Sequence, residues 1–99
     1  MMFVLTETWP VTSSVEVGKE TIKLAGRALP SHMKMLGPFV VLGGDGVKTY
    51  TIFEVEQGSA DESYSEMMRR LSGLFRIPGY KPTIEVAIST IEALPLVGL

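Results

Sequence analysis

Residues 42–56 read LGGDGVKTYTIFEVE, and the interpretation of this stretch decides the fold. Its glycines, lysine and threonine resemble a phosphate-binding loop, whose pattern is G-x-x-x-x-G-K-[ST] with a helix beginning there. Here Val47 separates Gly46 from Lys48, and the residues that follow alternate with the period of a strand. Residues 43–46, GGDG, are typical of a tight turn, because they tolerate positive φ angles. We therefore predict a β-hairpin and no nucleotide site.

Outward from this hairpin, the chain shows alternating strand and helix patterns. Strands are predicted at residues 1–9, 38–43, 47–56 and 81–90, and helices within residues 12–30 and 59–80. Each helix begins with a capping-box pattern, formed by Ser13 with Glu16 and by Ser59 with Glu62. The expected apolar stripe of the first helix contains Val15, Ile22, Ala25 and Leu29, and that of the second contains Tyr64, Met67, Met68, Leu71, Leu74 and Phe75.

The element order predicts the fold class. A chain of 99 residues is expected to form one domain, residues 1–99. The order strand, helix, strand, strand, helix, strand is that of a ferredoxin-like α+β fold, with an antiparallel four-stranded sheet and two helices on one face. The opposite face is partly apolar, and the hydrophobic fraction of 45% is high for so short a chain. We therefore expect a homodimer through the open sheet face and the apolar tail at residues 91–99.

Composition argues against several classes of partner. The net charge is −2 and no Lys/Arg block occurs, so we expect no nucleic-acid binding. No apolar run approaches the roughly 20 residues of a membrane helix, and the N-terminus lacks a signal-peptide pattern, which favours a cytoplasmic location. There is no cysteine, and no His/Asp/Glu cluster has ligand spacing. We expect neither a metal site nor a cofactor.

In length, element order and uncovered sheet, the chain resembles the dimeric α+β barrel superfamily. The stretches MMFVLTETW, GRALP, GVKTYTIFEVE and EVAIST carry this resemblance, and they are also similar to small uncharacterised bacterial and archaeal proteins of that superfamily. Its members include cofactor-independent monooxygenases, haem-degrading enzymes, lactone isomerases and non-catalytic ligand-sensing domains, so fold alone does not select an activity. Haem-degrading and several quinone-forming members use an asparagine with a tryptophan and a histidine. Trp9 and His32 are present here, but the chain contains no asparagine.

Six residues are candidates for ligand contacts: Glu7, Trp9, His32, Tyr50, Glu54 and Glu85. Glu7 and Trp9 share one face of the first strand; this face either lines a barrel or packs under the helices, with Glu7 at a frayed strand end. His32 is the sole histidine, in a connection before the second strand, where it could serve as a general base, although an ordinary surface histidine is the commoner outcome.

Tyr50, Glu54 and Glu85 form the remaining candidates. They either surround an apolar pocket or pair across strands with Lys48 or Lys81.

Three functional hypotheses follow. The leading one is a homodimer that binds a small apolar or aromatic molecule between the sheet and its partner. The first alternative is a cofactor-independent monooxygenase or isomerase that uses Glu7, His32 or Tyr50 for proton transfer. The second alternative is a non-catalytic dimerisation or regulatory module.

Overall fold

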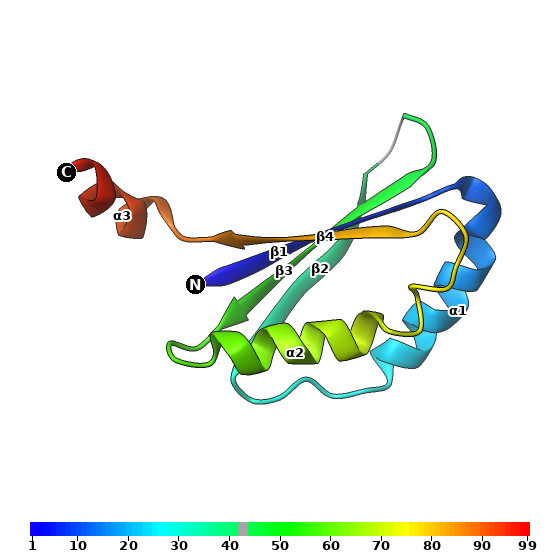
Figure 1. The fold of residues 1–99 in the computed structure, drawn as a ribbon, viewed down its shortest axis with the longest axis horizontal. Coiled ribbons are helices and arrows are strands. Elements are labelled where there is room, and N and C mark those ends of the chain that lie inside the picture. The colour runs from blue at the N-terminus through cyan, green and yellow to red at the C-terminus, as the bar shows by residue number, and fades with distance from the viewer. Residues whose placement is uncertain (42–43) are drawn as a thin grey trace.

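The computed structural model describes residues 1–41 and 44–99. Within these ranges four strands form one antiparallel sheet in the order β2-β3-β1-β4, which confirms the predicted α+β class and is compatible with a ferredoxin-like arrangement (Figure 1). The strands are β1 (Met2–Trp9), β2 (Met33–Val41), β3 (Val47–Val55) and β4 (Lys81–Ala87). The helices are α1 (Ser14–Ala25), α2 (Ala60–Leu71) and the short α3 (Thr90–Ala93), and 3₁₀ turns occur at Val11–Ser13 and Leu94–Val97.

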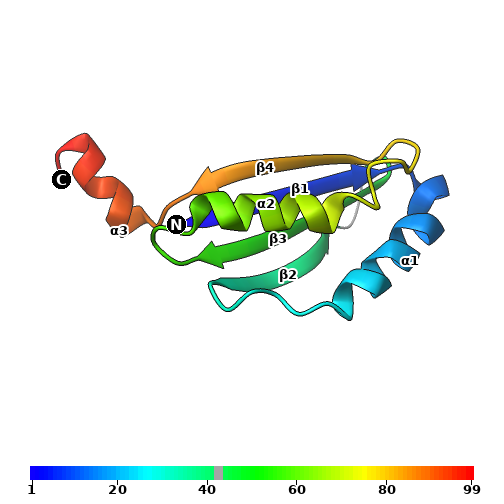
Figure 2. The same cartoon turned by 60° about the horizontal axis from the view of Figure 1, so that its bottom comes forward.

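Both long helices lie on the same side of the sheet, but they approach it differently (Figure 1). Figure 2 shows α2 running along the sheet over its central strands, whereas α1 lies towards one end of the sheet and at an angle to α2. The opposite sheet face has no helix over it among the described residues. The sheet therefore has one covered face and one open face.

Strand register determines which residues occupy each face. Leu5 pairs with Thr51 and Glu7 pairs with Thr49 across β1 and β3. Because side chains alternate along a strand, these four residues lie on one face, and both threonines are buried. Phe3 belongs to the same set and is 4% exposed, which identifies this face as the one under the helices.

The predicted hairpin joins β2 and β3, in which Val41 pairs with Lys48. Gly44 and Gly46 have φ angles of 85° and 83°, as the turn chemistry requires. A Cβ atom at Gly46 would lie 2.8 Å from the carbonyl oxygen of Trp9, so this position also needs glycine for space. Leu42 and Gly43, the latter a part of the predicted turn, lie outside the described residues.

Strand β2 begins at Met33, five residues before the predicted start at Pro38. The register between β2 and β3 shifts between Leu36 and Phe39, where Gly37 has a φ angle of 99°. Proline lacks an N–H donor, so a Gly-Pro pair is normally a strand boundary. Here the sheet continues past the pair through a local irregularity. Most of residues 31–37, which were expected to form a connection, therefore belong to β2.

The two capping-box patterns correctly predict where the helices begin. The side-chain hydrogen bonds that such boxes normally make are not formed. Ser13 and Ser59 occupy the N-cap positions without making side-chain caps. The hydroxyl of Ser13 instead donates to the carbonyl oxygen of Pro78 at 2.6 Å. That of Ser59 donates to the carbonyl oxygen of Glu56 at 2.7 Å. Ser13 therefore connects the start of α1 to the segment after α2.

The buried side of α1 also differs from the predicted stripe. Val15 and Ile22 are 70% and 75% exposed, whereas Val17 is 2% exposed. Leu24 is partly buried against the core. Because α1 meets the sheet near one end, only a narrow part of its surface is covered, and hydrophobic periodicity alone did not identify that part.

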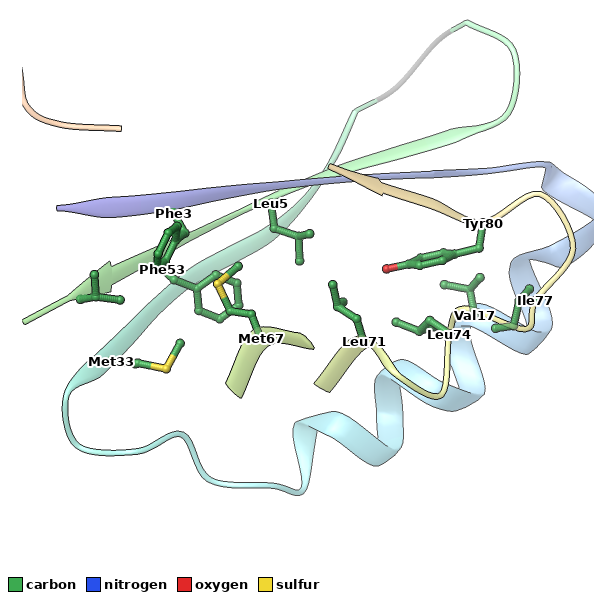
Figure 3. Packing of buried hydrophobic residues seen from close by; sticks show 11 residues of the cluster. Phe3, Leu5, Val17, Met33, Phe53, Met67, Leu71, Leu74, Ile77 and Tyr80 are labelled. Atoms are coloured by element: carbon green, nitrogen blue, oxygen red, sulfur yellow. The ribbon is translucent and has the colours of Figure 1, made fainter. Parts of the chain in front are cut away.

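The core forms between α2, the segment that follows it and the covered sheet face (Figure 3). Met67 and Leu74 are each 1% exposed, which confirms two positions of the stripe predicted for the second helix. Figure 3 shows the Tyr80 side chain extending inward, with its hydroxyl group directed towards the side chains from β1 and α2. The clustered buried residues are Phe3, Leu5, Val17, Met33, Phe53, Val55, Met67, Leu71, Leu74, Ile77 and Tyr80.

The open face and the C-terminal segment expose much apolar surface. On the open face, Leu36 and Phe39 of β2 are 57% and 51% exposed. The chain after β4 extends beyond the end of the sheet, away from α1 (Figures 1 and 2). Exposed apolar residues of this C-terminal arm, residues 88–99, are Ile88, Ile91, Leu94, Leu96, Val97 and Leu99. Among the described residues, no helix is both long and apolar enough to cross a membrane.

The position of α1 makes a testable prediction. Val17→Ala should lower the free energy of unfolding by about 1.5–3 kcal/mol, because it removes two buried methyl groups and leaves a cavity. Val15→Ala should change the free energy by at most about 0.5 kcal/mol. Both variants replace a valine of α1 by alanine, so each gains the same helix propensity. Urea unfolding measures both, and equal losses would contradict the observed orientation of α1.

Candidate functional site: a cavity between the helices and the sheet

A cavity of about 110 Å³ lies between the covered sheet face and both long helices. Its wall is mostly apolar, as small-molecule pockets usually are. The lining residues are Leu5, Glu7, Thr21, Leu24, Ala25, Met35, Pro38, Thr51, Phe53, Met67, Arg70, Leu71 and Leu74. The sheet provides the floor, and the two helices provide the sides.

The orientation of α1 produces this cavity. Ala25 is a small side chain on the wall, so α1 does not fill the space in front of β2. Met35 of β2 lines the cavity and remains 43% exposed. Arg70 of α2 holds the two helices together, since its guanidinium donates to the carbonyl oxygens of Leu24 and Arg27 at 3.3 Å. These carbonyls lie at the C-terminal end of α1, where cations are favoured.

Glu7 is the one carboxyl group among the residues that line this cavity. The Tyr80 hydroxyl donates to Glu7 Oε2 at 2.5 Å, and the Thr49 hydroxyl donates to Oε1 at 3.4 Å. Because the donors come from β3 and from the segment before β4, the carboxyl group is held between separate parts of the fold. None of the ion pairs found among residues 1–41 and 44–99 includes Glu7.

The surroundings of Glu7 perturb its proton affinity. Burial raises the pKa of the Glu7 carboxyl above its ordinary value of 4.5, because a buried charge loses hydration, and the Tyr80 and Thr49 hydrogen bonds oppose this increase. Burial, together with the nearby Glu7 carboxylate, raises the pKa of the Tyr80 hydroxyl above its usual range. A carboxyl group in a small apolar cavity can therefore bind a polar ligand group or exchange a proton with it.

Neither arrangement predicted for the first strand describes Glu7 fully. The face carrying Glu7 and Trp9 packs under the helices, yet Glu7 is hydrogen-bonded rather than frayed into solvent. The indole N–H of Trp9 donates to the Ser14 hydroxyl at 3.2 Å. Trp9 thus contacts the beginning of α1, and it is absent from the described lining of the cavity.

Tyr50, Glu54 and Glu85 lie on the open face, on the other side of the sheet from Glu7. Tyr50 pairs with Thr6, whereas Glu54 and Glu85 flank β1 on opposite sides. The three residues share this face, and the chain folds them away from the cavity.

The cross-strand ion pairs predicted as the alternative for these residues are also absent from the described part of the chain. No ion pair among the described residues joins Glu54 or Glu85 to Lys48 or Lys81. The Lys48 ammonium instead lies 5.1 Å from the centre of the Tyr50 ring, within the range of a cation–π contact.

His32 lies in the connection immediately before β2, where it is not part of the cavity lining but lines a surface depression together with Glu54. Its Nε2 atom is buried and has no hydrogen-bond partner within the described part of the chain. Glu62 and Glu66 of α2 line a shallow depression beside it. No group of three or more His, Asp or Glu side chains among the described residues has the geometry of a metal site.

Sequence reasoning missed two residues of this site. Arg70 was not among the candidate residues, yet it lines the cavity, while its neighbour Arg69 pairs with Glu66 at 2.7 Å. Tyr80 was treated only as the end of the second helical segment. An aromatic residue with a polar group directly before a strand is a weak signal, and its contact with Glu7 spans 73 positions.

No protein-family model matches this chain, and a search of curated proteins found no match. The site is therefore interpreted from its geometry.

The hydrogen bond between Tyr80 and Glu7 can be tested by titration. The Glu7 carboxyl should titrate above 4.5, and Tyr80→Phe should raise its pKa further, because the variant removes a donor that favours the ionised form. Carbon-13 NMR of the side-chain carboxyl measures both values. Tyr64→Phe, which removes a hydroxyl elsewhere, is the matched control and should leave the titration unchanged. A lower pKa in Tyr80→Phe would show that this hydrogen bond is absent.

Proposed function

We propose that the protein binds a small, largely apolar molecule in the cavity between α1, α2 and the covered sheet face. The observation that carries this proposal is the cavity itself, a mostly apolar space whose polar wall groups are one carboxyl, one guanidinium and two threonine hydroxyls. Sequence reasoning expected the ligand on the other side of the sheet, between the open face and a partner. The proposal keeps the class of ligand and changes its location.

Catalysis has less support than binding. The monooxygenase or isomerase hypothesis relies on proton transfer by Glu7, His32 or Tyr50. Glu7 alone lines the cavity, while Tyr50 lies on the open face and His32 in a loop. A single carboxyl group is sufficient for ligand recognition, whereas acid–base chemistry on a bound molecule normally needs a second positioned group.

Benzene is a suitable first probe, because an apolar cavity of about 150 Å³ is known to bind it. Benzene should shift the NMR signals of the Met35 and Met67 methyl groups, both of which line the cavity. Ala25→Phe should weaken binding at least about tenfold, or 1.4 kcal/mol, because the ring occupies the same space.

Ala28→Phe is the control, since it adds the same ring at an exposed position after α1 that is not part of the cavity wall. Equal loss of binding in both variants, or no methyl shifts in the unsubstituted protein, would reject the cavity as a binding site.

A second proposal concerns self-association, and a different observation favours it. The open face and the C-terminal arm leave apolar side chains in water, and exposed patches of this kind usually mark interfaces. We propose that two copies pack their open faces together and that the arm of each contacts the other. This proposal is compatible with a dimerisation module as well as with a ligand-binding protein.

Sedimentation tests self-association directly. The chain mass is 10.8 kDa, and we expect a particle of twice this mass. Phe39→Glu should shift the particle to the single-chain mass, because it introduces a charge into the proposed interface. Val40→Glu places the same charge on the adjacent residue, which pairs with Thr49 and faces the covered side. A single-chain mass for the unsubstituted protein would contradict the proposal.

A further inference from the structure

The carboxyl group of Glu7 has unused capacity as a hydrogen-bond acceptor. An ionised carboxylate offers about four acceptor positions. Tyr80 and Thr49 each donate one hydrogen bond to Glu7, and the second of these is long at 3.4 Å. None of the described residues forms an ion pair with it. A positively charged group in the cavity would therefore meet an acceptor that the protein itself leaves incompletely paired.

Arg70 is the positively charged side chain in the cavity wall, and two of its five N–H groups already hold the end of α1. Its Nη1 and Nη2 atoms each donate to a carbonyl oxygen of the segment at the end of α1. Those carbonyls carry the partial negative charge of a helix C-terminus, which compensates the guanidinium charge. An anionic ligand would need to displace these contacts. Arg70 therefore connects α2 to the end of α1 at the cavity wall and is less available to bind an anion.

From this asymmetry we propose that the cavity selects a small primary amine, whose ammonium group donates to Glu7 while its apolar body contacts Leu5, Leu24 and Leu74. This inference rests on the proposed binding function and adds the chemical class of the ligand. A charge-assisted hydrogen bond in a largely apolar site is stronger than a neutral one. The ammonium also relieves the unfavourable burial of the carboxylate.

The volume limits the size of this amine. A cavity of about 110 Å³ is smaller than the roughly 150 Å³ that binds benzene. Its wall is incomplete, since Met35 and Ala25 retain exposure to solvent. A short branched alkyl chain fits this volume, whereas a single ring must extend in part into the opening, with its amine directed towards Glu7.

Three probes of similar shape separate the charge preference from simple cavity binding: benzylamine, toluene and benzoate. At mildly alkaline pH, benzylamine keeps its proton while Glu7 ionises. Tyr80 keeps its proton, because burial and the nearby Glu7 raise the pKa of its hydroxyl. Arg70 is the other charged group that faces the cavity. We expect benzylamine to bind at least about tenfold more tightly than toluene, and benzoate to bind least. Calorimetry or methyl-shift titrations measure the three dissociation constants.

Glu7→Gln should remove the preference for benzylamine while toluene binding remains. Glu62→Gln, an exposed carboxylate of α2 outside the cavity, is the matched control and should keep the preference. A second readout needs no variant: benzylamine should lower the pKa of Glu7 in the unsubstituted protein, and toluene should not. This readout remains valid if Glu7→Gln does not fold.

The outcomes separate the two proposals. If toluene binds and benzylamine gains nothing, or if benzoate binds best, the amine inference is wrong and the binding function stands. If no probe binds, the proposed function and the inference both fail. A benzylamine preference that survives Glu7→Gln would also overturn the inference, because another group would then hold the ammonium.

Discussion

The packing of α2 across one face of the sheet is the contact on which the rest of the structure depends. Met67 and Leu71 of α2 are almost completely buried there, as is Leu74 in the segment that follows the helix. Helix α1 adds a single fully buried residue, Val17, and stands at an angle to α2. One helix is narrower than a four-stranded sheet, because neighbouring strands are nearly 5 Å apart and a helix is about 10 Å wide. The space that α2 cannot cover becomes the cavity in front of β2.

Polar contacts keep this incomplete layer in position. Arg70 connects α2 to the end of α1, while Ser13 connects the start of α1 to the carbonyl oxygen of Pro78. Tyr80 then reaches the Glu7 carboxyl on β1. These contacts surround the cavity without filling it. They also explain why a carboxyl group can remain in a mostly apolar wall, since each hydrogen bond offsets a part of its lost hydration.

Much of the fold could be predicted from local patterns. The turn glycines Gly44 and Gly46, the alternation along β3 and the burial of Met67 and Leu71 each depend on neighbouring residues, and the structure agrees with them. Two other positions of the stripe predicted for the second helix, Tyr64 and Phe75, are instead 47% and 46% exposed. The side of α1 that is buried was not predictable in this way, because it depends on where the helix meets the sheet. Val15 and Val17 have the same chemistry but opposite environments. The first half of β2 was not predicted, because a pair such as Gly37 and Pro38 normally marks a strand boundary. Here the sheet accommodates the pair by a shift in register.

The candidate site was predictable only in part. Glu7 stood out because a carboxylate on an apolar strand face is unusual. Its partner Tyr80 could not be found, because their contact depends on the path of the chain after α2. Strand alternation places Tyr50 and Glu54 on one face of β3, whereas the position of Glu85 on the same sheet face depends on how β1 pairs with β3 and β4. Alternation does not reveal which sheet face lies next to a cavity, so their relation to Glu7 needed the whole fold.

A crystal structure under xenon pressure is the sharpest test of the cavity, since xenon enters apolar cavities. We expect one xenon atom between α1 and the sheet, in contact with Leu24 and Leu74 and close to the Glu7 carboxyl. If α1 instead lay flat on β2, with Leu24 and Met35 filling the space and no xenon bound there, the cavity would not exist. The proposed function and the role given to Glu7 would then both be contradicted.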